Sequence, residues 1–182
     1  MNPSPDPSRL RVQFWPVADY DLRSTLECGQ AFHWIRSGAG WESVICDRWA
    51  RVEAAPGGLT VSWMEGASEA LWLQHHLAAD EVLEPIIASF PDDAPLRSAV
   101  ARCRGLRLLR QEPWECLASF ICSSTKQIVQ IRQIVELLSE RWGHPVAAPP
   151  EAVLNRAFPT AKTIVSAGEG ALRECKLGFR AP

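Results

Sequence analysis

No apolar run in this sequence approaches the roughly 18–20 residues that a membrane-spanning helix needs. The first ten residues are rich in Pro and Ser and lack an apolar segment, so we expect no signal peptide. No Cys-x-x-Cys pair occurs, and no cysteine spacing is typical of a zinc or iron–sulfur site. We therefore expect a protein that does not associate with a membrane and binds no metal or cofactor. Its cysteines are expected to be reduced thiols in the cytosol.

Lysine is also scarce, with three residues in 182, and the net charge of −2 is low for a nucleic-acid binder. The charge is divided unevenly along the chain. Residues 1–95 carry 6 Lys and Arg against 14 Asp and Glu, whereas residues 96–182 carry 13 against 7. We expect any polyanion to bind the second half, although two solvated surfaces of opposite sign would give the same count.

Apolar residues make up 47% of the chain and charged residues 22%, which excludes a mainly disordered protein. Short segments rich in aromatic and β-branched residues, separated by Gly-containing turns, predict an antiparallel sheet. They cover residues 31–35, 41–46, 49–54 and 59–63. Helical periodicity begins near Gly66 and predicts helices over 69–77, 80–90, 96–103, 113–121, 126–142, 150–156, 160–167 and 171–176.

The fold class is therefore α+β, with a sheet first and a helical array second. We expect a flexible N-terminus over residues 1–10, a sheet domain with flanking helices over 11–95 and the first part of a helical domain over 96–182. His75 and His76 are expected to be two partly exposed side chains, because adjacent helical residues point about 100° apart and do not easily share a metal ion. Most of the six cysteines are expected to be buried.

Four segments resemble one family, the 8-oxoguanine DNA glycosylases of base-excision repair. They are residues 26–34, 105–117, 119–124 and 176–181, and their order and spacing match the family. The resemblance covers nearly the whole chain. It implies an antiparallel (TBP-like) sheet domain followed by a helical glycosylase domain with a helix-hairpin-helix module. It also implies a monomeric enzyme that acts on duplex DNA containing 8-oxoguanine, in the cytoplasm and nucleoid of a bacterium or the nucleus of a eukaryote.

In the family, a lysine in a Gly-rich hairpin forms a Schiff base, supported by an aspartate, and nicks the abasic strand by β-elimination. Lys126, Lys162 and Lys176 all lack that context. We therefore expect no catalytic residue within these 182 positions, and a truncated form without activity of its own. The alternatives are a non-catalytic fragment that binds damaged DNA, or a glycosylase for alkylated bases.

The resemblance also assigns residues that contact the lesion. Gly29 matches the glycine whose main-chain carbonyl accepts the N7 proton that 8-oxoguanine has and guanine lacks. A turn glycine before a strand is the alternative. Gln30 and Phe32 follow in matching order, and Phe32 resembles a pocket or core aromatic.

Further residues match positions that contact the opened DNA. Thr125 stands where the family commonly has an asparagine that fills the gap left by the extruded base, and this role can shift to Lys126 or Gln127. Gln130 replaces an arginine that reads the orphaned cytosine, which weakens the expectation of a strict cytosine preference.

Two residues near the end of the sequence complete this set. Phe179 matches an aromatic wedge that inserts into the base stack beside the lesion. Arg180 matches an arginine that contacts the orphaned cytosine, with a surface arginine as the alternative.

Overall fold

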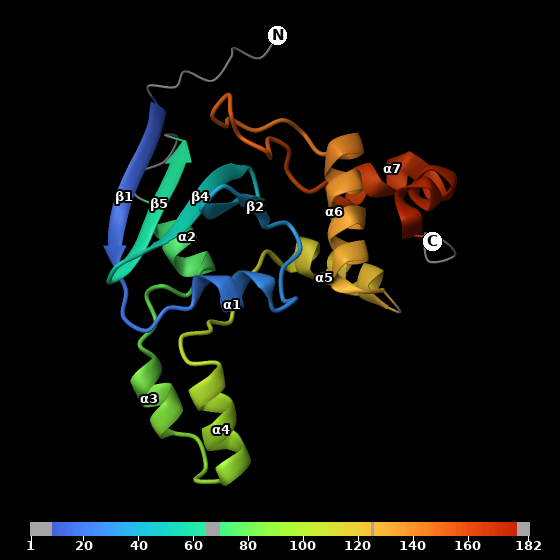
Figure 1. Ribbon diagram of the computed structural model, residues 1–182. Helices are drawn as coiled ribbons and strands as arrows, with labels where there is room; N and C mark the ends of the chain where they lie inside the picture. Colours follow the sequence, from blue (N-terminus) through green and yellow to red (C-terminus); the bar gives the residue numbers. More distant parts are fainter. Residues whose placement is uncertain (1–8, 65–69, 125, 178–182) are drawn as a thin grey trace.

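The computed structural model describes residues 9–64, 70–124 and 126–177 and shows a sheet joined to a helical region (Figure 1). All strand pairs are antiparallel and the order is β1-β5-β4-β3-β2. The α+β class predicted from the sequence is confirmed. The strands are β1 (Leu10–Pro16), β2 (Ile35–Ser37), β3 (Gly40–Ile45), β4 (Arg48–Ala55) and β5 (Gly58–Met64).

Most of the helices follow the sheet in the chain, and α1 lies between its first two strands. They are α1 (Leu22–Glu27), α2 (Leu71–His76), α3 (Leu83–Ala88), α4 (Ala94–Arg102), α5 (Pro113–Ser123), α6 (Ile128–Trp142) and α7 (Ala161–Leu172), followed by a short turn of π-helix, η2 (Arg173–Leu177). Helices α3 and α4 form a hairpin that projects from the rest of the molecule in Figure 1. Neither of these two helices has a buried residue.

The sheet forms its core by the alternation that a half-buried strand requires. In β5, Leu59, Val61 and Trp63 point inward and are buried, whereas the residues between them are partly exposed. Leu26 of α1 and Leu73 of α2 are fully buried in the same cluster. Burial of this continuous apolar surface is the main term that stabilises the N-terminal part.

A second core lies among α5, α6 and α7. The apolar stripe of α6 is buried at Ile131, Ile134, Val135 and Leu138. Helix α5 is less buried, and its buried residues are Ser119 and Cys122. Three large apolar side chains of α5 are exposed on the described part of the molecule: Leu117, Phe120 and Ile121.

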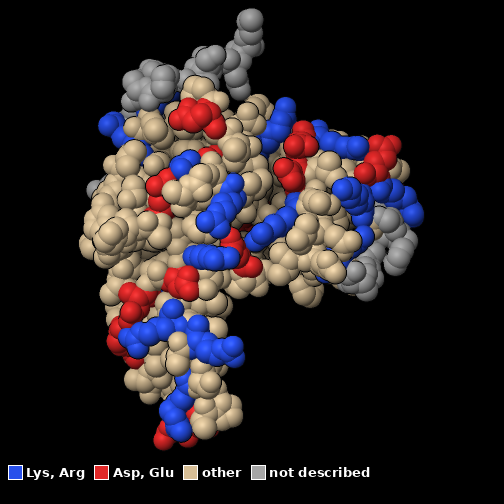
Figure 2. All heavy atoms as spheres, in the orientation of Figure 1, with Lys and Arg blue, Asp and Glu red and all other residues tan. Residues whose placement is uncertain are grey.

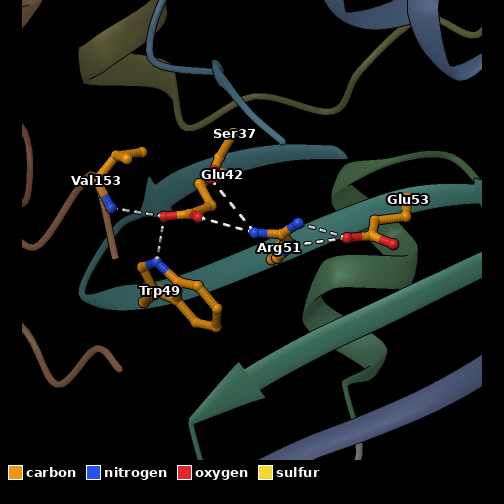
Figure 3. Close-up of polar contacts among 6 residues, drawn as sticks. All are labelled: Ser37, Glu42, Trp49, Arg51, Glu53 and Val153. Atoms are coloured by element: carbon orange, nitrogen blue, oxygen red, sulfur yellow. Dashed lines mark hydrogen bonds and ion pairs between the residues drawn. The ribbon is translucent and has the colours of Figure 1, made fainter. Parts of the chain in front are cut away.

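A buried carboxylate joins the sheet to the helical region (Figure 3). Glu42 on β3 is 1% exposed, and its Oε2 accepts hydrogen bonds from Val153 N at 2.9 Å and Trp49 Nε1 at 3.3 Å. Its Oε1 lies 3.3 Å from Arg51 Nη1, and Arg51 also pairs with Glu53. Because a buried charge is tolerated only when it is paired and hydrogen-bonded, this network fixes residue 153 against the sheet.

Several predicted elements differ from the structure. Residues 31–34 form no strand, because Ala31, His33 and Trp34 are all buried and this pattern does not alternate. No helix covers residues 150–156. That segment belongs to a loop that an isolated bridge between Pro145 and Arg156 closes. The sequence analysis also missed β1 and α1.

The cysteine and histidine predictions need similar corrections. Four cysteines are exposed, and only Cys122 and Cys175 are buried. His76 is buried rather than partly exposed, because α2 packs that side of the helix on the sheet core. No described helix is long and apolar enough to cross a membrane.

Candidate nucleic-acid interface

Gly29 lies just after α1, whose C-cap residue is Cys28. Its φ is +89°, a left-handed conformation that favours glycine and commonly ends a helix. A methyl group added at Gly29 would lie 2.9 Å from Cδ1 of Ile128, the first residue of α6. The fold therefore places Gly29 beside the start of α6, next to the residues predicted to fill the gap in the DNA.

Gln30 is held by main-chain groups. Its Nε2 donates to Thr25 O at 2.9 Å and to Arg107 O at 2.8 Å, and its Oε1 accepts from Leu109 N at 2.9 Å. Both N–H groups of the amide are used in these contacts. In this arrangement Gln30 links α1 to the segment before α5, and the structure gives no support to direct contact with a base.

Phe32 is partly buried against the α5–α7 core and lines a cleft of about 190 Å³ between residues 32–36 and α6. Arg132 and Glu136 of α6 line the same cleft. Arg132 Nη2 donates to Leu26 O at 3.4 Å, which ties α6 to the last turn of α1. The cleft therefore adjoins the loop that carries Gly29.

The loop before α6 carries the predicted gap-filling residues. Thr125 lies outside the described residues. Gln127 occupies the N-cap position of α6, where the hydroxyls of the preceding Ser-Ser-Thr run would be expected from sequence to cap the helix, and its N–H donates to Gln130 Oε1 at 2.9 Å. Gln127 and Gln130 are both exposed. Gln130 thus caps its own helix, while its amide N–H groups remain on the surface.

Lys126 connects this loop to the C-terminal segment. Its Nζ donates to Lys176 O at 3.1 Å, and Lys176 Nζ donates to Gln133 Oε1 at 3.0 Å. Phe179 and Arg180 lie outside the described residues. The two lysine contacts join α6 and the loop before it to η2. Figure 2 shows basic side chains over this end of the molecule and over its centre, interspersed with acidic ones.

A cluster of buried titratable groups was missed by sequence reasoning. His33 is 3% exposed, and its Nδ1 lies 3.4 Å from Glu115 Oε1 without hydrogen-bond alignment. Burial lowers the pKa of His76 to about 4, with the charge of Glu115 opposing this shift. Both histidines line a small cavity of about 20 Å³, enough for one water molecule. No periodicity or motif marks this cluster, because its residues come from three distant segments.

The described residues contain no group of three or more His, Cys, Asp or Glu side chains that could hold a metal ion. The residues of the candidate interface offer main-chain groups, side-chain amides, an aromatic ring and a cationic side chain. Such groups contact phosphates, base edges and base faces.

Comparisons with known proteins identify relatives of this chain. The chain is 29% identical over 167 residues to the N-glycosylase/DNA lyase OGG1 of Arabidopsis thaliana, across 88% of this chain and 45% of that protein. It is 40% identical over 79 residues to the N-glycosylase/DNA lyase of Saccharomyces cerevisiae, across 43% of this chain and 21% of that protein. This chain thus matches less than half of the length of either curated relative.

Solved structures give the same fold. A structure of MBOgg1 in complex with a low-affinity DNA ligand aligns with a TM-score of 0.82 and 26% identity, covering 95% of this chain and 59% of that one. The apo 8-oxoguanine glycosylase/lyase of Clostridium acetobutylicum aligns with a TM-score of 0.79 and 23% identity, over 93% and 62% of the two chains. The protein-family model of the 8-oxoguanine DNA glycosylase N-terminal domain matches residues 14–117, more than half of the sequence. On this match, together with the sheet and the placement of Gly29, the chain belongs to the 8-oxoguanine DNA glycosylase family.

Proposed function

We propose that this chain recognises 8-oxoguanine in duplex DNA, as the lesion-binding part of a base-excision repair N-glycosylase/DNA lyase. The observation that carries the proposal is the position of Gly29, held at positive φ against Ile128 at the start of α6. Enzymes that act on a base extrude it from the helix and read it in a pocket. A loop glycine beside the gap-filling segment suits that task, because a base can approach its main chain closely.

The chemical difference between the lesion and guanine lies at N7 and C8. 8-Oxoguanine carries a proton on N7, whereas N7 of guanine is an acceptor. A main-chain carbonyl only accepts hydrogen bonds, so the Gly29 carbonyl would bind the lesion and repel the lone pair of guanine. We propose this carbonyl as the discriminating group, with Phe32 contributing the wall of the neighbouring cleft.

The remaining proposed contacts are electrostatic and apolar. Lys126 and Gln127 stand at the loop before α6 and would contact phosphate or the gap in the strand. Thr125, Phe179 and Arg180 keep the roles that the resemblance implies. If its partner is damaged duplex DNA, the protein acts in the compartment that holds the genome of its cell.

Strand cleavage requires a nucleophile that this sequence does not show in the family context. Lys126 and Lys176 hold surface hydrogen bonds, and Lys162 is exposed on α7. A Schiff-base lysine must instead be desolvated or flanked by charge so that its amine is deprotonated near neutrality. The 182-residue chain is therefore proposed to bind the lesion without cutting the DNA.

Two assays on the same purified chain test this proposal. Fluorescence anisotropy should show tighter binding to an 8-oxoguanine:cytosine duplex than to a guanine:cytosine duplex of the same sequence. Borohydride trapping should give no covalent adduct, with the Arabidopsis enzyme as the positive control. Equal affinity for the two duplexes would overturn the recognition role. An adduct formed as fast as with the control would overturn the assignment of no nucleophile.

A further inference from the structure

The side-chain amide of Gln30 is fixed by three hydrogen bonds to two segments that lie far apart in the sequence. It spans Thr25 on α1 and the extended segment at Arg107 and Leu109, with all three heavy-atom distances between 2.8 and 2.9 Å. The same region carries a fourth link, in which Arg107 N donates to Thr25 Oγ1 at 3.1 Å. Thr25 is fully buried and Arg107 is 2% exposed, so these hydrogen bonds face little competition from water.

The three hydrogen bonds of the Gln30 amide, here called the clamp, also restrict the residue before it, Gly29. The Gly29 carbonyl and the Gln30 N–H belong to one peptide unit, which is planar. Glycine at positive φ has wide conformational freedom, so nothing in Gly29 itself fixes the direction of its carbonyl. A side chain anchored to three main-chain groups immediately after Gly29 supplies that constraint.

We propose that Gln30 is a positioning residue for lesion recognition, which aims the Gly29 carbonyl and does not touch the base. The inference rests on the proposed role of Gly29. A hydrogen bond whose geometry is preorganised keeps its full selectivity, whereas a mobile carbonyl must be ordered when the base binds. Loss of the clamp should therefore reduce the preference for 8-oxoguanine over guanine by about fivefold to tenfold.

The main variant is Gln30→Met, which keeps the length of the side chain and removes every hydrogen bond of the amide. Gln30→Glu is the second variant, because it retains an acceptor for Leu109 N and loses only the two donors. Thr25→Val is the stability control, since it removes the fourth link and leaves the amide of Gln30 in place. Gln13→Leu is the surface control, because Gln13 is exposed on β1.

Two readouts are measured on each folded variant, below its melting temperature. The first is the ratio of affinities for 8-oxoguanine:cytosine and guanine:cytosine duplexes. The second is hydrogen–deuterium exchange of residues 29–31 and of Leu109 N–H in the DNA-free protein. We expect both Gln30 variants to lose selectivity and to exchange faster at residues 29–31, and Gln30→Met alone to exchange faster at Leu109 N–H, while both controls keep the selectivity of the unmodified chain.

The outcomes separate this inference from the function on which it rests. If the unmodified chain prefers the lesion and the Gln30 variants keep that preference, the positioning role is overturned and the proposed function stands. If Thr25→Val loses selectivity to the same extent, the effect is one of general stability and the positioning role is also overturned. If the unmodified chain shows no preference, both the function and the inference fail.

Discussion

Gly29 and Ile128 are 99 positions apart in the chain, yet a methyl group on Gly29 would lie 2.9 Å from Ile128 Cδ1. This close approach joins the loop after α1 to the first residue of α6. It therefore brings two segments, each proposed to contact DNA, to one place.

The first prediction concerns the short distance between Gly29 and Ile128. Gly29→Ala should lower the free energy of unfolding by about 1–2 kcal/mol, because alanine is strained at φ +89°. The added contact with Ile128 is partly relieved in the double variant with Ile128→Val, which removes Cδ1. Urea unfolding measures both.

Gly170→Ala is the matched control, since nothing lies within 4 Å of its added methyl group and the residue is within α7. It should be neutral or stabilising by up to about 1 kcal/mol. A Gly29→Ala variant as stable as the control would contradict the strained geometry.

The second prediction concerns Glu42. Glu42→Gln should destabilise the chain by about 2–3 kcal/mol, because the buried side chain loses the charge that pairs with Arg51 and accepts from Val153 N–H. Glu53→Gln is the control, since Glu53 meets the same Arg51 at a partly exposed position and should cost less than about 1 kcal/mol. Thermal unfolding of both variants compares them directly, and equal losses would show that the buried network has no special weight.

The third prediction concerns pH. His76 has a pKa of about 4 in the folded protein against 6.5 for the unperturbed side chain, so the unfolded chain binds more protons between these values. Stability should therefore fall as the pH drops from about 6.5 to 4, by an amount on the order of 3 kcal/mol. The measurement is unfolding by urea across that range.

The variant His76→Phe should flatten this part of the profile. His75→Gln should leave it in place, because His75 is exposed on the same helix. An unchanged slope in His76→Phe would assign the acid sensitivity to other groups.

The fourth prediction concerns salt. Lys126→Ala should weaken binding to damaged and undamaged duplexes alike and reduce the slope of log K against log salt by about 1. Lys162→Ala should leave the slope unchanged, because that lysine lies at the start of α7, away from the proposed loop. Identical slopes for the two variants would remove Lys126 from the interface.

The sequence predicts the α+β class and most helices because their signals are local. Pro113 begins α5 as expected, and Thr160 caps α7 through its side chain. The strand predicted over residues 31–35 is wrong at 31–34, because tertiary packing buries neighbouring residues there and no strand forms. The helix predicted from Pro150 is wrong because Pro145 and Arg156 pair instead.

The residues of the candidate site also differ in whether a local sequence signal predicts them. Gly29 is found from a motif, and its positive φ supplies a physical reason for glycine. The tertiary role of Gln30 is invisible in sequence, since its partners lie up to 79 positions away. The His33–Glu115 approach depends on the same long-range packing and has no local signal.

In the function proposed above, the Gly29 carbonyl accepts the N7 proton of the lesion. The most direct measurement compares the affinities of this chain for duplexes that carry 8-oxoguanine or 7-deaza-8-oxoguanine opposite cytosine. The second base keeps the overall shape and the C8 oxygen, but a CH2 group replaces N7–H and cannot donate a comparable hydrogen bond. We expect binding to be weaker by about fivefold to tenfold for the 7-deaza base, because one hydrogen bond is lost. Equal affinity for the two duplexes would contradict it.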